Sequence, residues 1–303
     1  MNLGNLDITG LYMGNVPASA YVGSELVWPT TPPTPPVPPT PVYSAMPLTL
    51  EVTSAGTIML KATDTSVTKT IQYKLNDGNW TSMTTSTAGT TWNVSAGDKL
   101  QFMGDNLTYG SGQTSLNASG TKYNTFSGST AWFKVYGNLM SLRDSTGYTT
   151  ADTMGNYFVT SLFRGCTGLT DATNLILPNF LSGVCYCNMF NSCTNLTAAP
   201  VLPATGTGDA WCYCGMFRYC SELTTAPDLP LSIIGTNAYA NLFQGCTKLN
   251  YIKCLLTNTY PQFLASWVSG VAATGTFVKD ANTSWSTGSS GIPNGWTVVD
   301  YSE

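Results

Sequence analysis

Phe163-Arg-Gly-Cys166-Thr-Gly-Leu169 is the first of four units in this sequence that share the pattern Phe-x-x-Cys-x-x-Leu. The pattern returns at Phe190, Phe217 and Phe243, so successive units lie 27, 27 and 26 residues apart. A period of about 20–29 residues with regular leucines is the range of leucine-rich repeats. One unit cannot bury its apolar residues alone, whereas stacked units share a continuous core. The sequence therefore predicts a short stack of repeats.

Each repeat is expected to combine a helical turn with a short strand. Spacings of three and six place Phe, Cys and Leu on one face of a short helical or 3₁₀ turn. The segment that follows, such as 223–230, is expected to be extended, because proline disfavours the helical region at the residue before it. Other positions keep the same register: Cys-Tyr-Cys at 185–187 and 212–214 becomes Ala-Tyr-Ala at 238–240.

The nine cysteines of the chain all lie in this repeat region. Buried packing residues, zinc ligands and disulfides are the three interpretations. Cys-x-Cys pairs without histidine match the usual zinc spacing poorly. Alanine at 238 and 240 favours packing, because a small buried hydrophobe tolerates that exchange and a metal ligand does not. We expect no metal site, and whether any cysteine forms a disulfide stays open.

The predicted fold class is mostly β. Residues 42–145 predict a β-sandwich, since short alternating segments such as 70–75 are followed by the hairpin signal Asp77-Gly78. Residues 146–260 predict a leucine-rich-repeat solenoid. Residues 261–303 break the period, and a terminal repeat needs a cap, so they are expected to form a C-terminal cap.

The first 28 residues are too short to bury a core of their own. They contain two similar strand-like phrases, at 11–15 and 20–24, and their apolar side chains need cover from another copy or from a receptor protein. Residues 29–41 are rich in proline, which favours a semi-rigid polyproline II spacer of roughly 40 Å. A ligand for an aromatic-lined recognition domain is the competing interpretation of that run.

The composition excludes several function classes. Only 9% of residues are charged, the net charge is −4, and no lysine or arginine precedes Lys61, so nucleic acid and anionic lipid are not expected partners. The absence of histidine removes the commonest general base and the commonest metal ligand. We therefore assign no catalytic residue and no cofactor, and expect no enzyme.

A glycosidase is the enzymatic alternative, and it would need two carboxylates roughly 5–10 Å apart. Asp98 and Asp105 are the nearest pair. Asp98 follows Ala-Gly, which is more typical of a turn residue.

The beginning of the sequence suggests synthesis in a cytosol with reduced thiols. Residues 1–7 lack the basic and apolar regions of a secretory signal. No apolar run reaches about 18 residues, so membrane insertion is not expected.

Residues 44–301 resemble the BspA-type leucine-rich-repeat proteins of gut Bacteroidetes and their phages. The four Phe-x-x-Cys-x-x-Leu units, the preceding 137–142 (GNLMSL) and the ending 291–298 (GIPNGWTV) carry the resemblance. The phrases at 12–15 and 21–29 resemble the anchoring peptides that begin many phage fibre and appendage proteins. That second resemblance implies virion-anchoring roles for Leu11, Tyr12, Met13, Tyr21, Val22, Val27 and Trp28.

Together the two resemblances imply a structural protein at the surface of a phage virion, a fibre or decoration of head or tail. Its N-terminus would dock on capsid or tail proteins, and the remainder would present a binding surface to a host or gut glycan or protein. A symmetric homo-oligomer, dimer or trimer, is expected. Exposed aromatics can stack on sugars, which gives four candidate ligand-binding residues: Tyr123, Trp132, Trp267 and Trp285.

A bacterial surface adhesin of the BspA-like type is the alternative. It would carry an export signal or a lipobox cysteine, and the first cysteine is Cys166.

Overall fold

The computed structural model describes two compact units, Met1–Val42 and Tyr43–Glu303. In the first unit it describes six short strands, and in the second it describes residues 43–112, 121–151, 153–178, 181–202, 206–229 and 231–301. The described residues contain β-strands, turns and short 3₁₀ segments but no α-helix. The prediction of a mostly β chain is therefore confirmed.

The described residues of the N-terminal unit form three antiparallel strand pairs. They are β1 (Asn2–Leu3) with β2 (Leu6–Asp7), β3 (Tyr12–Met13) with β4 (Val16–Pro17), and β5 (Ala20–Val22) with β6 (Glu25–Trp28). Both strand-like phrases of the sequence thus contain a strand.

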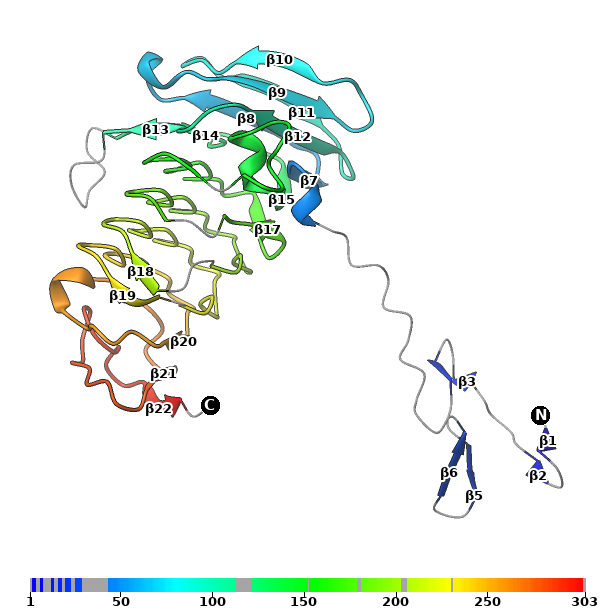
Figure 1. The fold of residues 1–303 in the computed structure, drawn as a ribbon, viewed down its shortest axis with the longest axis vertical. Helices are drawn as coiled ribbons and strands as arrows, with labels where there is room; N and C mark the ends of the chain where they lie inside the picture. The colour runs from blue at the N-terminus through cyan, green and yellow to red at the C-terminus, as the bar shows by residue number, and fades with distance from the viewer. Residues whose placement is uncertain are drawn as a thin grey trace. The chain divides into compact units, whose positions relative to one another are not determined.

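The second unit begins with two facing antiparallel sheets (Figure 1). The first has the order β10-β9-β12-β7-β15, with β16 (Leu169–Asp171) added in parallel at its edge, and the second has the order β11-β8-β14-β13. The strands are β7 (Leu48–Ser54), β8 (Gly56–Ala62), β9 (Thr70–Leu75), β10 (Thr81–Thr84), β11 (Thr90–Val94), β12 (Lys99–Gly104), β13 (Gly110–Ser111), β14 (Lys122–Thr125) and β15 (Trp132–Asn138). Short 3₁₀ segments lie at Tyr43–Ala45, Thr65–Val67, Leu139–Leu142 and Pro261–Phe263.

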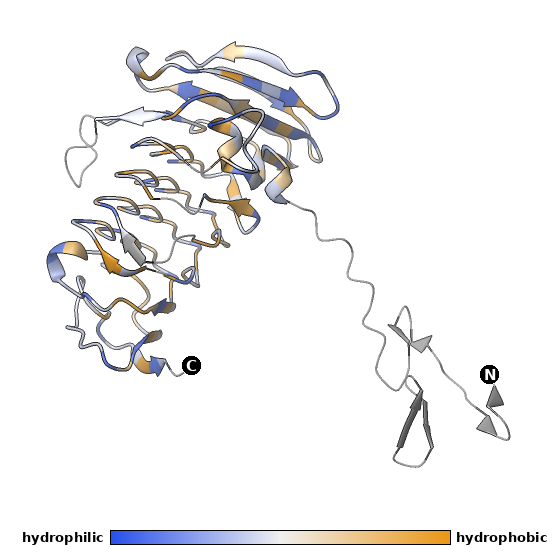
Figure 2. Ribbon diagram, in the orientation of Figure 1, coloured by the Kyte–Doolittle hydropathy of each residue, from blue (hydrophilic) through white to orange (hydrophobic). Residues whose placement is uncertain are grey.

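The two sheets enclose an apolar core. Hydropathy alternates along their strands, as a sheet with one buried face requires (Figure 2). Trp92 of β11 meets Phe102 of β12 edge to face at 5.6 Å, and Phe102 meets Phe126 at 5.0 Å. The hairpin predicted from Asp77-Gly78 is confirmed, since β9 pairs with β10 across that turn.

The Phe-x-x-Cys-x-x-Leu units form successive coils of the chain, named here coils 1 to 4 after Phe163, Phe190, Phe217 and Phe243. In each coil, the backbone N–H groups alternate between a carbonyl of the next coil and a carbonyl of the same coil. The Phe163 N–H donates to Met189 O of the next coil (2.9 Å), whereas the Cys166 N–H donates back to Phe163 O (3.0 Å). A 3₁₀ helix would send every N–H to the third preceding carbonyl. The helical or 3₁₀ turn expected for each repeat is therefore wrong.

A four-residue alternation of backbone conformation replaces that helix. In coil 1 the φ angle is +61° at Ser161 and +74° at Gly165. A turn with positive φ at its third residue is type II, and one with negative φ there is type I, so consecutive turns alternate in type. The same alternation recurs in the later coils, at Asn188 and Ser192, Gly215 and Tyr219, and Asn241 and Gly245. As a result, every second backbone N–H group donates to a carbonyl of the next coil.

Aromatic rings stack from one end of the coils to the other. Phe126, Phe163, Phe190, Phe217 and Phe243 lie with successive centroids 5.4, 5.6, 5.5 and 5.8 Å apart and with ring planes within 14° of parallel. Phe126 belongs to the segment after β14, so the sheets supply the first ring. One buried core therefore runs from Leu48 to Trp296.

Parallel strands join the coils to the sheets and to each other. β16 (Leu169–Asp171) and β17 (Leu175–Ile176) pair with β15, and β18 (Gly206–Gly208) pairs with β19 (Leu231–Ile234). β20 (Tyr251–Cys254), β21 (Thr276–Asp280) and β22 (Thr297–Tyr301) form a separate sheet. The boundaries predicted at 145 and 260 stay predictions, since one core crosses both.

A fifth coil follows the four that the sequence reveals. The Phe243 N–H donates to Trp267 O and the Gly245 N–H to Ser269 O, both at 2.8 Å, in continuation of the inter-coil pattern. Val268 occupies the position of the repeated phenylalanine, so the sequence pattern misses this coil. Trp267 lies against Phe243 at 6.3 Å and ends the phenylalanine stack. It also lies against Tyr239 at 6.5 Å and ends a second row of rings, Tyr186, Tyr213 and Tyr239.

Replacing Phe217 by alanine is expected to lower the free energy of unfolding by about 3–5 kcal/mol, because the ring is fully buried between two neighbours. Urea denaturation followed by tryptophan fluorescence measures the change. Val201→Ala is the matched control: that side chain is 77% exposed, so its effect should stay within about 0.5 kcal/mol. Equal losses in both variants would contradict the stacked core.

Candidate binding surface

The four aromatics proposed as ligand-binding residues lie in three separate places, since β15 and β14 belong to different sheets. Trp132 starts β15 and is 49% exposed, and Tyr123 lies in β14 beside coil 1. Trp267 and Trp285 stack on each other at 5.8 Å in the C-terminal segment. The structure therefore does not bring the four together.

The prediction for Trp267 is wrong. Its side chain is fully buried, and its indole N–H donates to Gly291 O at 2.9 Å. The ring closes the end of the core, so no ligand can stack on it. Trp285 is half-buried and meets Phe277 edge to face at 5.1 Å, so it also serves the packing of this end.

The residues proposed for virion anchoring fall in the N-terminal unit. Tyr12 and Met13 lie in β3, Tyr21 and Val22 in β5, and Val27 and Trp28 in β6. Leu11 lies outside the described residues, and anchoring stays a prediction for all seven.

A row of polar side chains occupies the position that follows each repeated phenylalanine; three of them are partly exposed, whereas the one in coil 2, Asn191, is buried. We call it the polar column: Arg164, Asn191, Arg218 and Gln244. The backbone fixes its alignment, because the carbonyls of Asn191, Arg218 and Gln244 each accept an N–H from the preceding coil at 2.7 Å. Side chains from units 27 or 26 residues apart therefore lie one above another.

Both arginines of the polar column are paired with a tyrosine. The Arg164 guanidinium lies 5.7 Å from the ring centroid of Tyr123 and donates to its hydroxyl at 3.3 Å. The Arg218 guanidinium lies 4.7 Å from the ring centroid of Tyr219 and donates to its hydroxyl at 2.9 Å. Cation–π contact and hydrogen bond hold each pair in a fixed orientation.

Glycine at 245 allows the Tyr219 ring to lie where it does. A Cβ atom at Gly245 would overlap Cδ1 of that ring, and the φ angle of +77° there suits glycine. The ring lies over the next coil and is still 42% exposed. Gly245 of coil 4 thus leaves room for the Arg218–Tyr219 pair of coil 3.

The polar column was not predicted from the sequence, although the sequence contains a signal for it. Each of the four units carries a polar residue directly after its phenylalanine. Only stacking shows that these residues form one row, and only the tertiary structure places Tyr123 beside Arg164.

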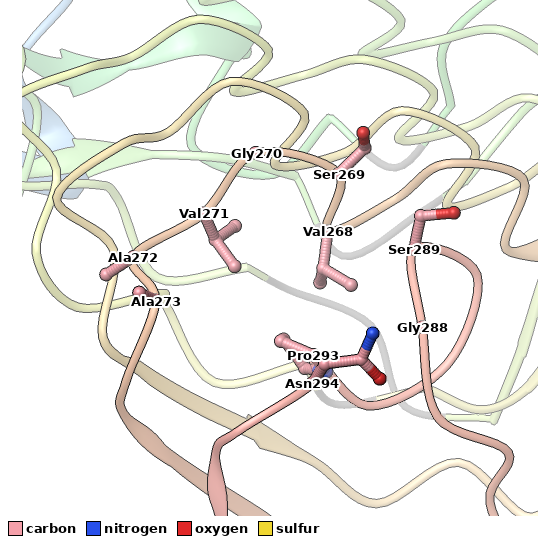
Figure 3. Close-up of a pocket in the computed structure, with 10 residues that line it drawn as sticks. All are labelled: Val268, Ser269, Gly270, Val271, Ala272, Ala273, Gly288, Ser289, Pro293 and Asn294. Atoms are coloured by element: carbon pink, nitrogen blue, oxygen red, sulfur yellow. The ribbon is translucent and has the colours of Figure 1, made fainter.

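A hollow of about 210 Å³ lies between the fifth coil and the C-terminal segment (Figure 3). Val268, Val271 and Pro293 line it together with Ser269 and Asn294, and its lining contains no titratable side chain. It offers hydrogen-bonding groups and apolar contact but no acidic or basic side chain.

The two aspartates of the glycosidase alternative lie at opposite ends of β12. Asp98 precedes the strand and Asp105 follows it, which places them roughly 20 Å apart in an extended chain. Asp98 accepts the Ser95 N–H at 2.7 Å, and this bond holds the pKa of its carboxyl below the ordinary value. Asp98 is therefore a turn residue, as the sequence indicates, and the pair is too far apart for glycoside hydrolysis.

The nine cysteines are free and buried, which confirms the packing interpretation. Three of their thiols also donate across coils: the Sγ atoms of Cys193, Cys220 and Cys246 lie 3.0–3.2 Å from the carbonyl oxygens of Phe163, Phe190 and Phe217. No group of three or more possible metal ligands lies within the described residues. The described part of the chain likewise contains no helix able to span a membrane.

The buried thiols are expected to make the folded chain less stable at alkaline pH. Burial raises the pKa of Cys185, Cys246 and Cys254 to about 12, whereas an unfolded thiol ionises near pH 8.5. Above about pH 8.5 the unfolded chain releases protons that the folded chain keeps, so stability falls as pH rises, by up to about 1.4 kcal/mol per unit for each thiol. Urea midpoints at pH 7.5 and 9.5 should show this fall.

Cys185→Ala is the control for that pH effect, because alanine occupies the matching position 238 in coil 4. The variant should show a smaller fall between the two pH values. Equal midpoints at both pH values in the unsubstituted chain would contradict the buried thiols.

Comparison with protein-family models, with curated proteins and with solved structures finds no match to this chain. Its function must therefore be inferred from its own residues and their arrangement.

Proposed function

We propose that this chain is a structural display protein of a phage virion. Residues 43–303 present a binding surface to a host or gut receptor, and the N-terminal unit docks on other virion proteins. The observation that carries the proposal is the polar column: a repeated interior of stacked rings supports an outer row whose residues differ from coil to coil. Such a division between constant core and variable surface is typical of repeat proteins that bind ligands.

The finer fold belongs to the same proposal. The coils are a leucine-rich-repeat solenoid of the BspA-like type, supported by the repeat spacing and by the inter-coil hydrogen bonds. The two facing sheets are a β-sandwich that covers the first coil, and the segment containing Trp267, Phe277 and Trp285 is the C-terminal cap. Both ends of a stack need such covers, since an end coil would otherwise expose its core.

Docking by the N-terminal unit rests on its small size. Isolated two-stranded pairs are marginal in water, and the unit consists of three of them. A partner surface, or the same segment of two or three chains in a symmetric oligomer, would supply apolar cover for such pairs. The seven anchoring residues and the exposed Trp132 remain the proposed contacts to virion and receptor.

Deletion of residues 2–28 is expected to remove the protein from purified particles, because the docking contacts are lost. Quantitative mass spectrometry of gradient-purified particles measures incorporation. The matched control is a fusion of residues 1–42 to an inert fluorescent protein, which should still be incorporated.

Undiminished incorporation of the deleted chain would overturn the anchoring role. Detection of the chain on host cells grown without phage, by antibody labelling, would favour the bacterial adhesin instead.

A further inference from the structure

We propose that the polar column, together with Tyr123 and Tyr219, binds a linear acidic polysaccharide, a sugar chain that carries carboxylate or sulfate groups. This inference rests on the proposed display function and names the class of receptor.

The first argument is the pairing of the cationic side chains. The chain contains three arginines, and two of them occupy the same repeat position. All four ion pairs among the described residues use lysine, and neither Arg164 nor Arg218 belongs to one. Both guanidinium groups are half-buried in an acidic protein without a carboxylate partner. A bound anion would supply the missing partner.

The second argument is the direction of the hydrogen bonds. A guanidinium only donates, so the hydroxyl of each paired tyrosine must accept and directs its own proton elsewhere. Each Arg–Tyr pair therefore offers N–H and O–H donors together, the arrangement that suits an oxyanion.

Between the two pairs, coil 2 keeps its polar groups occupied within the protein. The Asn191 amide donates to Asn188 Oδ1 at 2.9 Å, and its oxygen accepts the Ser192 hydroxyl at 2.8 Å. Asn191 is also buried, so between the two arginines the column presents no side-chain donor.

The third argument is spacing. Arg164 and Arg218 are two coils apart, and neighbouring coils are separated by the ring spacings of 5.6 and 5.5 Å. One coil is comparable to the advance of one sugar ring along a linear polysaccharide. A polymer with an anionic group on every second sugar would thus reach both arginines at once, and the exposed Tyr219 ring offers a face for a sugar.

Nucleic acid fits this surface less well. Duplex binding neutralises many phosphates and needs an extended basic footprint, whereas this column holds two cations on a chain of net charge −4.

The test is titration calorimetry of the full chain with hyaluronan, which has one carboxylate on every second sugar, and with chondroitin sulfate, which adds a sulfate. Carboxyl-reduced hyaluronan is the neutral probe. We expect binding of at least one acidic polymer, weakening with added salt, and none of the neutral one. The double variant Arg164→Gln/Arg218→Gln should lose roughly tenfold or more in affinity, since two charge-assisted contacts disappear.

Arg143→Gln is the matched control. It removes the third arginine, which lies after the 3₁₀ segment Leu139–Leu142 and outside the column, and should change affinity less than about twofold. Arg218→Lys keeps the charge but not the planar fork, so it should weaken binding by several-fold while folding normally in a thermal melt.

Binding of neither acidic polymer would overturn the inference, as would equal binding of the neutral polymer or unchanged affinity in the double variant. Tighter binding of duplex DNA through the same arginines would replace the glycan by nucleic acid. These outcomes are independent of the virion proposal: a chain present on particles but indifferent to both polymers overturns this inference alone, and absence from particles overturns the display function alone.

Discussion

Every second backbone N–H in the coils donates to a carbonyl of the next coil, and the rest of this unit depends on that alternation. The remaining N–H groups close turns within the coil, so the backbone polar groups find partners without a helix or a wide sheet. Positive φ angles at every fourth residue make this possible, and glycine, asparagine and serine occupy most of those positions. The hydrogen bonds thereby set the distance between coils before any side chain is considered.

Side-chain packing follows from that distance. A separation near 5.5 Å is what stacked phenyl rings adopt, so the phenylalanine of each coil lies on that of the coil before it. The cysteine three residues later is small enough to stay inside, and its thiol reaches a carbonyl of the preceding coil. The repeated Phe-x-x-Cys is therefore a packing pattern in which the thiol makes a weak hydrogen bond.

The same geometry separates repeated positions from variable ones. Positions that point inward must repeat, whereas the position after each phenylalanine can differ in every coil without disturbing the core. The polar column therefore contains two arginines, each paired with a tyrosine, and the neutral Asn191 lies between them. The sheets close one end of the stack through Phe126, and Trp267 closes the other, so the row is held on a rigid support.

The sequence by itself determined the period, the β character, the hairpin at Asp77-Gly78 and the burial of the cysteines. Each of these features follows from local composition or from spacing along the chain. Only the tertiary structure decided the turn type of the coils, the fifth coil at Val268 and the burial of Trp267. It also decided the meeting of Tyr123 with Arg164, which lie 41 residues apart. These features depend on contacts between coils. A hydrogen bond to the next coil overrides the local helical preference. Valine fills a phenylalanine position because stacking requires only that the side chain there be apolar.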